Sequence, residues 1–397
     1  MALSKIDIAN MVTGATPVAN GGTGQTTLAA AGLDKRPNKS PLIINGDMAV
    51  AQRATSVTGK TTGDIYTVDR MALLLDAQGT YTVAQESLTS GNAFANGFAN
   101  AWRVDCTTAD ASPAASDQLG LQYTFEGQDL QVFKKGTANA EKFTLAFWVK
   151  SNKTGTGNIQ LKDKDNSNRQ CTQSYTISSA DTWEHKVCVF GADTTGAFGD
   201  DNAKSLIINW YLGSGTDSSS GTANHGTWEA QDQTKVNDGG TLNINASTDN
   251  DWAITGIQLE VGEFTSATLP PFEHEVFTDN LKRCQRYFET TFDYGTAIGT
   301  STSVGMIRSG GNQGGRTSGR MGHSHTYHTL KRAVPTVTFY DNSGNSGACA
   351  RIDQGSGTGS NKNMGVATGA RTNVQVTSTG DSTADVMAYH FTAVAEL

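Results

Sequence analysis

The sequence carries little charge, and its balance is acidic. Asp, Glu, Lys and Arg together make up 17% of the 397 residues, whereas typical soluble domains hold roughly 25%. The formal net charge is −8 at pH 7. Because binding of a polyphosphate begins with a basic surface, this composition argues against a nucleic-acid partner, and an anionic membrane surface is disfavoured for the same reason.

Cysteine pairs and long hydrophobic runs are also missing. The five cysteines are widely spaced and never arranged as C-x-x-C, so neither a disulfide framework nor a zinc site is indicated. We expect them to be small buried side chains. No apolar stretch is long enough for a signal peptide or for crossing a bilayer. The sequence therefore predicts a soluble protein made in a cytoplasm, without membrane insertion and without a cofactor.

Small uncharged residues take the place of the missing charge. Gly alone accounts for 44 positions, above the usual share of about 7%, and Thr, Ser and Asn are abundant. A helical protein needs long periodic runs of Ala, Glu, Lys and Leu instead. The composition therefore predicts a mainly β fold, and the length predicts two or three compact units at roughly 150 residues per domain.

Short alternating segments bounded by turns are typical of β-sandwiches. In residues 143–150 (FTLAFWVK), the odd-numbered side chains share one face, which we expect to be core, and the even-numbered ones, Trp148 among them, share the other. In residues 205–212, the even-numbered side chains group in the same way. This spacing sends Tyr211 to the opposite face, with Ile207 and Asn209.

Six short motifs occur in a fixed order along the chain. They are VANGGTG at 18–24, INGDMAVAQR at 44–53, GIQLEVG at 256–262, CQRYF at 284–288, AVPTVTF at 333–339 and AEL at 395–397. The ordered set resembles the tail-fibre and receptor-binding proteins of tailed bacteriophages. The resemblance implies a homotrimer on the virion whose N-terminus attaches to a phage tail or adaptor protein. It also implies non-catalytic recognition of a host cell-surface glycan.

The middle of the chain is similar to jelly-roll carbohydrate-binding modules. The similarity rests on the Asn-Gly-Asp at 45–47, the FWVK at 147–150 and a tryptophan-containing strand that precedes the last strand. Met48 departs from the pattern, since an aromatic residue is common at this position. The resemblance implies a β-sandwich domain that binds carbohydrate.

The expected organisation has four parts. Residues 1–40 lack strong periodicity, and one such chain cannot bury enough apolar surface to order itself, so we expect an extended trimerisation and attachment segment. Residues 41–275 are expected to form a jelly-roll-like, carbohydrate-binding domain, and residues 276–290 a linker helix. Residues 291–397 are expected to form a second β-sandwich, the receptor-binding tip.

The candidate glycan contacts lie in the middle domain, which holds all six tryptophans. Pyranose rings stack on aromatic faces, but tryptophans inside strand-like runs are expected to pack in the core. Trp228 lies in the Ser/Gly/Asn-rich residues 215–231, where no strand pattern holds it in a core, so it is the main candidate. His225 in the same loop and Tyr211 complete the predicted site.

Two segments have the residue types of a metal site. His323 and His325 have strand spacing, so three chains that meet on an axis could supply six nitrogens to one transition metal; the alternative is ordinary surface imidazoles. Residues 163–168 begin like a calcium loop but lack the glycine turn and the distal Glu of an EF-hand. A hairpin turn is therefore expected there, with a structural calcium ion as the alternative.

Catalytic motifs do not occur in the sequence, which holds neither G-x-S-x-G nor H-E-x-x-H. Glu126, Asp129, Glu273 and Glu275 could form a glycosidase pair, but sequence spacing does not show which carboxyls meet. We therefore expect no enzyme and no catalytic residue. Two alternatives stay open: a fibre-borne polysaccharide depolymerase, although no solenoid repeat is visible, and a purely structural tail or decoration protein.

Overall fold

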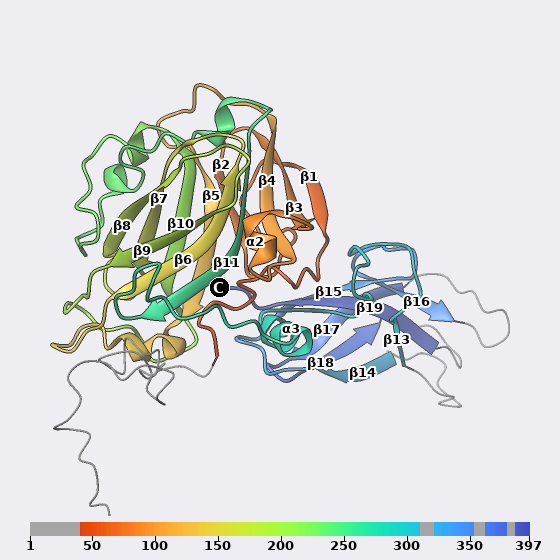
Figure 1. The fold of residues 1–397 in the computed structure, drawn as a ribbon. Coiled ribbons are helices and arrows are strands. Elements are labelled where there is room, and N and C mark those ends of the chain that lie inside the picture. Colours follow the sequence, from red (N-terminus) through yellow and green to blue (C-terminus); the bar gives the residue numbers. More distant parts are fainter. Residues whose placement is uncertain (1–39, 310–320, 353–361, 379–385) are drawn as a thin grey trace, which may run out of the picture.

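The computed structural model describes residues 40–309, 321–352, 362–378 and 386–397 (Figure 1). Nearly all of the predicted attachment segment, including the motif at 18–24, lies outside the described residues. The described chain is mainly β, with strands in antiparallel sheets and one short helix between two sets of strands, which confirms the predicted fold class. Among the described helices, none is long and apolar enough to span a membrane.

Two antiparallel sheets face each other in the first sandwich (Figure 1). The first sheet has the strand order β1 (Ser56–Lys60), β3 (Thr80–Ser87), β4 (Asn100–Thr108), β11 (Asp251–Val261), β6 (Phe143–Ser151) and β9 (Glu184–Phe190). The second sheet has the order β2 (Ala72–Asp76), β5 (Gln118–Glu126), β10 (Lys204–Ser214), β7 (Gly155–Asp163) and β8 (Gln170–Ile177). Strands that are neighbours in these sheets are often far apart in the sequence. The core between the sheets therefore forms only when the whole of residues 56–261 is folded.

The core of the sandwich lies between the sheets and is rich in aromatic rings. The odd-numbered side chains of β6 from Phe143 to Val149 are fully buried there, as their spacing predicts. Trp210 of β10 is also fully buried, and its ring meets that of Phe147 edge to face at 6.0 Å between centroids. Burial of each large apolar side chain stabilises the fold by about 1.5–3 kcal/mol. All five cysteines are free and buried, as expected.

Helix α3 (Phe277–Gln285) leads into the C-terminal unit. Its strands are β12 (Phe288–Thr290), β13 (Ile307–Ser309), β14 (Met321–Thr326), β15 (Thr336–Tyr340), β16 (Ala348–Ile352), β17 (Lys362–Gly369), β18 (Asn373–Ser378) and β19 (Val386–Val394). β19 pairs with β13 and β16 along its first half and with β12 and β15 along its second. The unit has its own core, built around Phe339, Met387, Tyr389 and Phe391.

Buried ion pairs join the C-terminal unit to the sandwich. Glu126 at the end of β5 accepts hydrogen bonds from Arg286 Nε and Nη2 at 2.7 and 2.6 Å and from the Tyr287 hydroxyl at 2.6 Å. Glu396 binds Arg53 Nη2 at 3.0 Å and Arg70 Nη1 at 2.5 Å. The motifs INGDMAVAQR, CQRYF and AEL therefore meet at this junction. Because breaking a buried pair leaves an uncompensated charge, these contacts hold the two units in one arrangement.

Candidate functional site

A hollow of about 380 Å³ lies on the outer face of the first sheet, on the side away from the core. Strands β6, β9 and β11 form its floor. Its walls come from the residues that follow helix α2 (Gly91–Ala95) and from residues 266–274. We call it the Trp148 groove, and its main side chains are those of Phe98, Trp148, His185, Gln258, Phe272 and His274.

Trp148 lies in the floor because of its place in β6. The strand alternates, so Phe147 and Val149 point into the core while Trp148 points to the outer face. His185 is its direct cross-strand neighbour on β9, and the two rings lie 5.0 Å apart with a tilt of 34°. The Trp148 side chain is half-buried, so part of it meets solvent.

Three rings pack against one another in the wall of the groove. Phe98 and Phe272 meet edge to face at 4.9 Å, and His274 lies 5.1 Å from Phe98 and 4.9 Å from Phe272. Gly256 makes this possible, because a Cβ at its position would lie 2.6 Å from the Phe98 ring, and its φ of +61° is unfavourable for other residues. The groove is therefore formed before any ligand arrives.

Uncharged hydrogen-bonding groups lie beside the rings. Gln258 Nε2 donates to Pro270 O at 3.1 Å and to Glu260 Oε1 at 3.2 Å, which anchors residues 266–274 to β11. No hydrogen bond found within the described residues uses the Gln258 Oε1 or the indole N–H of Trp148. The Asn96 amide, whose Nδ2 binds Asn92 O at 2.8 Å, adds a further carbonyl oxygen.

Electrostatics keep the floor of the groove uncharged. Burial lowers the pKa of His185, and the nearby charge of Lys186 lowers it further. The imidazole is therefore neutral at pH 7, where one nitrogen donates a hydrogen bond and the other accepts one. A neutral imidazole beside an indole is suited to binding hydroxyl groups.

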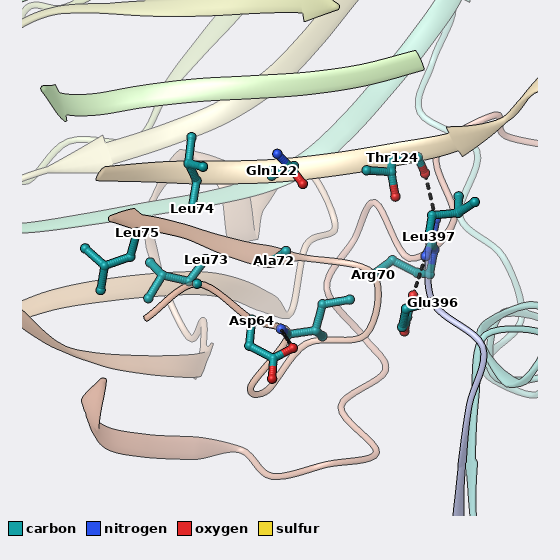
Figure 2. A pocket seen from close by; sticks show the side chains of 12 residues that line it. Asp64, Arg70, Ala72, Leu73, Leu74, Leu75, Gln122, Thr124, Glu396 and Leu397 are labelled. Atoms are coloured by element: carbon teal, nitrogen blue, oxygen red, sulfur yellow. Dashed lines mark hydrogen bonds and ion pairs between the residues drawn. The ribbon is translucent and has the colours of Figure 1, made fainter. Parts of the chain in front are cut away.

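A second hollow, of about 350 Å³, lies on the outer face of the second sheet (Figure 2). β2 and β5 contribute Leu74 and Gln122, and the chain end contributes Glu396. Arg70, its one strong cation, already binds Glu396 and the Thr124 carbonyl, as the dashed lines in Figure 2 show. None of the residues that line this hollow, all of them in the described chain, is aromatic.

The predicted exposure of Trp228 is wrong. Its side chain is 8% exposed and belongs to the main core, where its ring lies 5.8 Å from Phe143 and its Nε1 donates to Gly191 O at 2.8 Å. The segment that carries it pairs with the edge of β8 through Gln170 and Glu229, which inserts the indole between the two sheets. The Trp228 ring thus offers no open face for a sugar.

The other two residues of the predicted glycan site lie apart from the groove. Tyr211 is on the outer face of the second sheet, as expected, but it is 2% exposed. Its hydroxyl donates to Gln160 Oε1 at 3.3 Å. His225 is exposed, but it does not line either hollow.

The two histidines of the predicted metal site share one face of β14. They are half-buried and face the interior of the C-terminal unit, where the His323 ring lies 6.3 Å from Tyr389 and the His325 ring 4.8 Å from Phe391. His325 Nε2 also lies 4.0 Å from Glu289. Within the described residues, no group of three His, Cys, Asp or Glu side chains is placed to hold a metal. A metal on a threefold axis stays a prediction.

Residues 163–168 connect β7 to β8, as predicted for a hairpin turn. The fully buried carboxylate of Asp163 binds Lys135 Nζ at 2.5 Å and Asn166 Nδ2 at 2.8 Å. Lys135 Nζ also contacts Asp193 and the carbonyl oxygens of residues 195 and 196. An ammonium group therefore occupies the centre of this oxygen cluster.

Sequence reasoning missed the residues that form the groove. The spacing predicts that Trp148 lies on the face of its strand opposite the core, but Trp148 was still expected to pack in the core. An aromatic ring on the outer face of a strand is instead a sign of a binding surface. His185, Phe272 and His274 carry no such signal. They come together only because β9 pairs with β6 and because the chain after β11 folds back over the sheet.

No protein-family model and no curated protein sequence matches the chain. Several solved structures are similar at a low level. The enzymatically active domain of bacteriophage CBA120 tailspike protein 4 has 12% identity and a TM-score of 0.27, over 56% of this chain and 21% of that one. The C-terminal family 22 carbohydrate-binding module of Clostridium thermocellum Xyn10B has 11% identity and a TM-score of 0.27, over 53% and 95%. The family 11 module from Clostridium thermocellum, in complex with a mixed-linked tetrasaccharide, has 10% identity and a TM-score of 0.26, over 53% and 98%.

Proposed function

We propose that this protein binds a host cell-surface saccharide in the Trp148 groove without cleaving it, as the receptor-binding subunit of a phage tail fibre. The observation that carries the proposal is the partly exposed indole of Trp148, held beside uncharged hydrogen-bonding groups in a preformed hollow. A sugar ring offers C–H groups on one side, which pack on an aromatic face, and hydroxyls at its rim, which need donors and acceptors. The groove supplies both kinds of contact.

Assembly as a homotrimer follows from the resemblance of the six motifs to tail fibres. In this arrangement residues 1–40 attach to the tail or to an adaptor protein, and the sandwich and C-terminal unit project toward the host. Three copies of one groove raise the overall affinity through effective concentration, so each groove needs only weak binding, roughly millimolar to micromolar. Low charge density suits adhesion by stacking and hydrogen bonds.

Non-catalytic binding is favoured over cleavage because the four candidate carboxylates do not line the groove. Glu126 is fully buried and bound to Arg286 and Tyr287. Glu275 binds Arg283 Nη1 at 2.6 Å. A glycosidase needs two carboxyl groups on either side of the scissile bond. A depolymerase would therefore need a second site, and its sign would be reducing sugar released from host polysaccharide.

Virion adsorption in the presence of purified full-length protein tests the proposal. We expect wild-type protein to compete with virions for host cells and to release no sugar, and Trp148→Ala to lose the competition. Phe94→Ala is a matched control, because Phe94 is an exposed aromatic residue on α2 that does not line the groove. Sugar release would favour the depolymerase, and unaltered adsorption with wild-type protein would favour a structural role.

A further inference from the structure

We propose that the Trp148 groove is selective for uncharged sugar residues and rejects sugars that carry a carboxylate, sulfate or phosphate. This inference rests on the proposed function and narrows its ligand. The groove has aromatic rings and uncharged amide groups, but no Arg or Lys side chain that could pair with an anionic sugar. Anionic surface polysaccharides would then bind only through neutral residues in their repeats.

The titratable side chains in the lining of the groove are the imidazoles of His185 and His274. None of its lining residues, all of which belong to the described chain, is Asp, Glu, Lys or Arg. Recognition of a carboxylate or phosphate in proteins relies on Arg or Lys, because charge-assisted hydrogen bonds offset the loss of water from the anion. An anionic sugar would lose hydration in this groove and gain no such bond.

Two lysines that are close to lining residues in the sequence already have carboxylate partners. Lys150, which follows Trp148 on the same face of β6, lies 3.4 Å from Glu86 and 5.4 Å from the Trp183 ring. Lys186, which follows His185, lies 2.6 Å from Glu184. Each ammonium group therefore has a carboxylate partner, and neither reaches the lining.

Negative charge lies behind the groove instead. The carboxylate of Glu260 accepts the hydrogen bond from Gln258, so it stands next to the amide that would bind the sugar. The net charge of −8 also disfavours an anionic ligand.

The size of the hollow favours a short saccharide. At about 380 Å³ it lies at the small end of ligand pockets, which span roughly 300–1,000 Å³. Residues 266–274 form a wall on one side, so the groove fits a chain end or a side branch of a polysaccharide better than the middle of a long polymer.

The test uses host surface polysaccharide before and after chemical reduction of its carboxylates to hydroxymethyl groups, with binding followed by calorimetry. We expect the affinity of the full-length protein to be at least as high after reduction, and to change less than about twofold between about 50 and 500 mM salt. Trp148→Ala should lose at least about tenfold in affinity, and Trp148→Tyr, which keeps a ring, should lose less. Thermal unfolding of each variant controls for folding.

The possible outcomes distinguish a failure of the preference for neutral sugars from a failure of the proposed function. Binding that depends on Trp148 but is lost after carboxylate reduction, or that falls steeply with salt, overturns the preference for neutral sugars and leaves the proposed function standing. Binding that neither Trp148 variant alters overturns the proposed function, because the saccharide site then lies elsewhere. Binding that depends on Trp148 and survives reduction and salt supports both.

Discussion

The two outer faces of the first sandwich meet solvent in opposite ways. On the second sheet, Gln122, Asn209, Gln160 and Gln170 form a chain of amide hydrogen bonds of 2.9–3.0 Å across four strands. Residues 232–238 cover one end of this chain, where the carbonyl oxygen of Asp232 accepts from Gln170. On the first sheet, the Trp148 groove is lined by aromatic rings and by polar groups that keep unused hydrogen-bonding capacity. The polar groups on the second sheet are hydrogen-bonded within the protein, whereas those in the groove on the first sheet can bind a ligand.

The comparison shows that polar residues on a sheet do not by themselves mark a binding surface. The amides of the second sheet look like sugar-binding groups in the sequence, but Gln160 is fully buried and its donors and acceptors are used. Rings with an open face and polar groups without a partner are the better indication. Of the two hollows described above, the one on the first sheet combines the two, and the one on the second sheet has no aromatic lining.

The largest expected effect comes from a core residue of the first sandwich, Trp228. Trp228→Ala removes a core indole between the sheets and its hydrogen bond to Gly191. We expect the free energy of unfolding to fall by about 3–5 kcal/mol, measured by chemical denaturation. Saccharide affinity should stay unchanged under conditions where the variant is folded. A large loss of saccharide affinity with little loss of stability would contradict the placement of the saccharide site on the first sheet and of Trp228 in the core.

A buried ion pair within the C-terminal unit, between Glu289 and Lys331, gives the next effect, and unlike either face of the sandwich it depends on ionisation. Burial raises the pKa of Glu289, but His325, Lys331 and His328 outweigh it and lower the pKa to about 2. A lowered pKa means that the ionised group stabilises the fold above the ordinary pKa of 4.5 and that this stability is lost as the pH falls from 4.5 to 2. The full contribution is about 3 kcal/mol.

Unfolding at several pH values compares wild type with Glu289→Gln. We expect the variant to be less stable at pH 7 and the difference to disappear near pH 2. If the difference in unfolding free energy between the two proteins does not change with pH, the lowered pKa of Glu289 is contradicted. Saccharide affinity at neutral pH should be the same in both proteins, since the groove lies on another surface.

Two substitutions compare the buried part of the outer face of the second sheet with its half-buried end. Gln160→Leu removes the bonds that Gln160 makes to Asn209 Nδ2, the Tyr211 hydroxyl and Gln170 Oε1 in a buried place, at a cost of about 1–3 kcal/mol. Gln122→Leu acts at the half-buried end of the same amide chain, where water can replace the lost group, so we expect a smaller cost. Equal losses in denaturant titrations would show that residues 232–238 do not seal this face.

The smallest expected effect is at the rim of the groove. His274 is exposed and touches Phe98 and Phe272 through its ring. His274→Ala should therefore leave stability within about 0.5 kcal/mol of wild type. We expect saccharide affinity to fall by about two- to fivefold in a calorimetric titration, because one wall of the groove is shortened. No change in affinity would place the sugar deeper, against Trp148 alone.

Local spacing predicted much of the fold but little of the site. The alternation in residues 143–150 predicted both the core face of β6 and the outward direction of Trp148, because side chains alternate along any strand. The hairpin at residues 163–168 followed from its turn residues. These predictions needed only neighbours in the sequence.

The errors arose where distant segments meet. Trp228 looked exposed because residues 215–231 have no strand pattern, yet the segment is held by the edge of β8 and by the gap between two sheets. The groove was invisible for the same reason, since His185 and Phe272 reach Trp148 only through strand pairing and chain reversal. A sequence pattern cannot report such pairings.

The most direct test of the account is ¹⁹F NMR of protein labelled with fluorotryptophan, which reports on the six tryptophans at once. The Trp148 resonance is assigned with Trp148→Phe, and fragments of the host surface polysaccharide are then added. The account predicts that the Trp148 resonance shifts while those of the buried Trp102, Trp210, Trp228 and Trp252 stay in place. An unchanged Trp148 resonance at saturating saccharide, with binding shown independently, would contradict it.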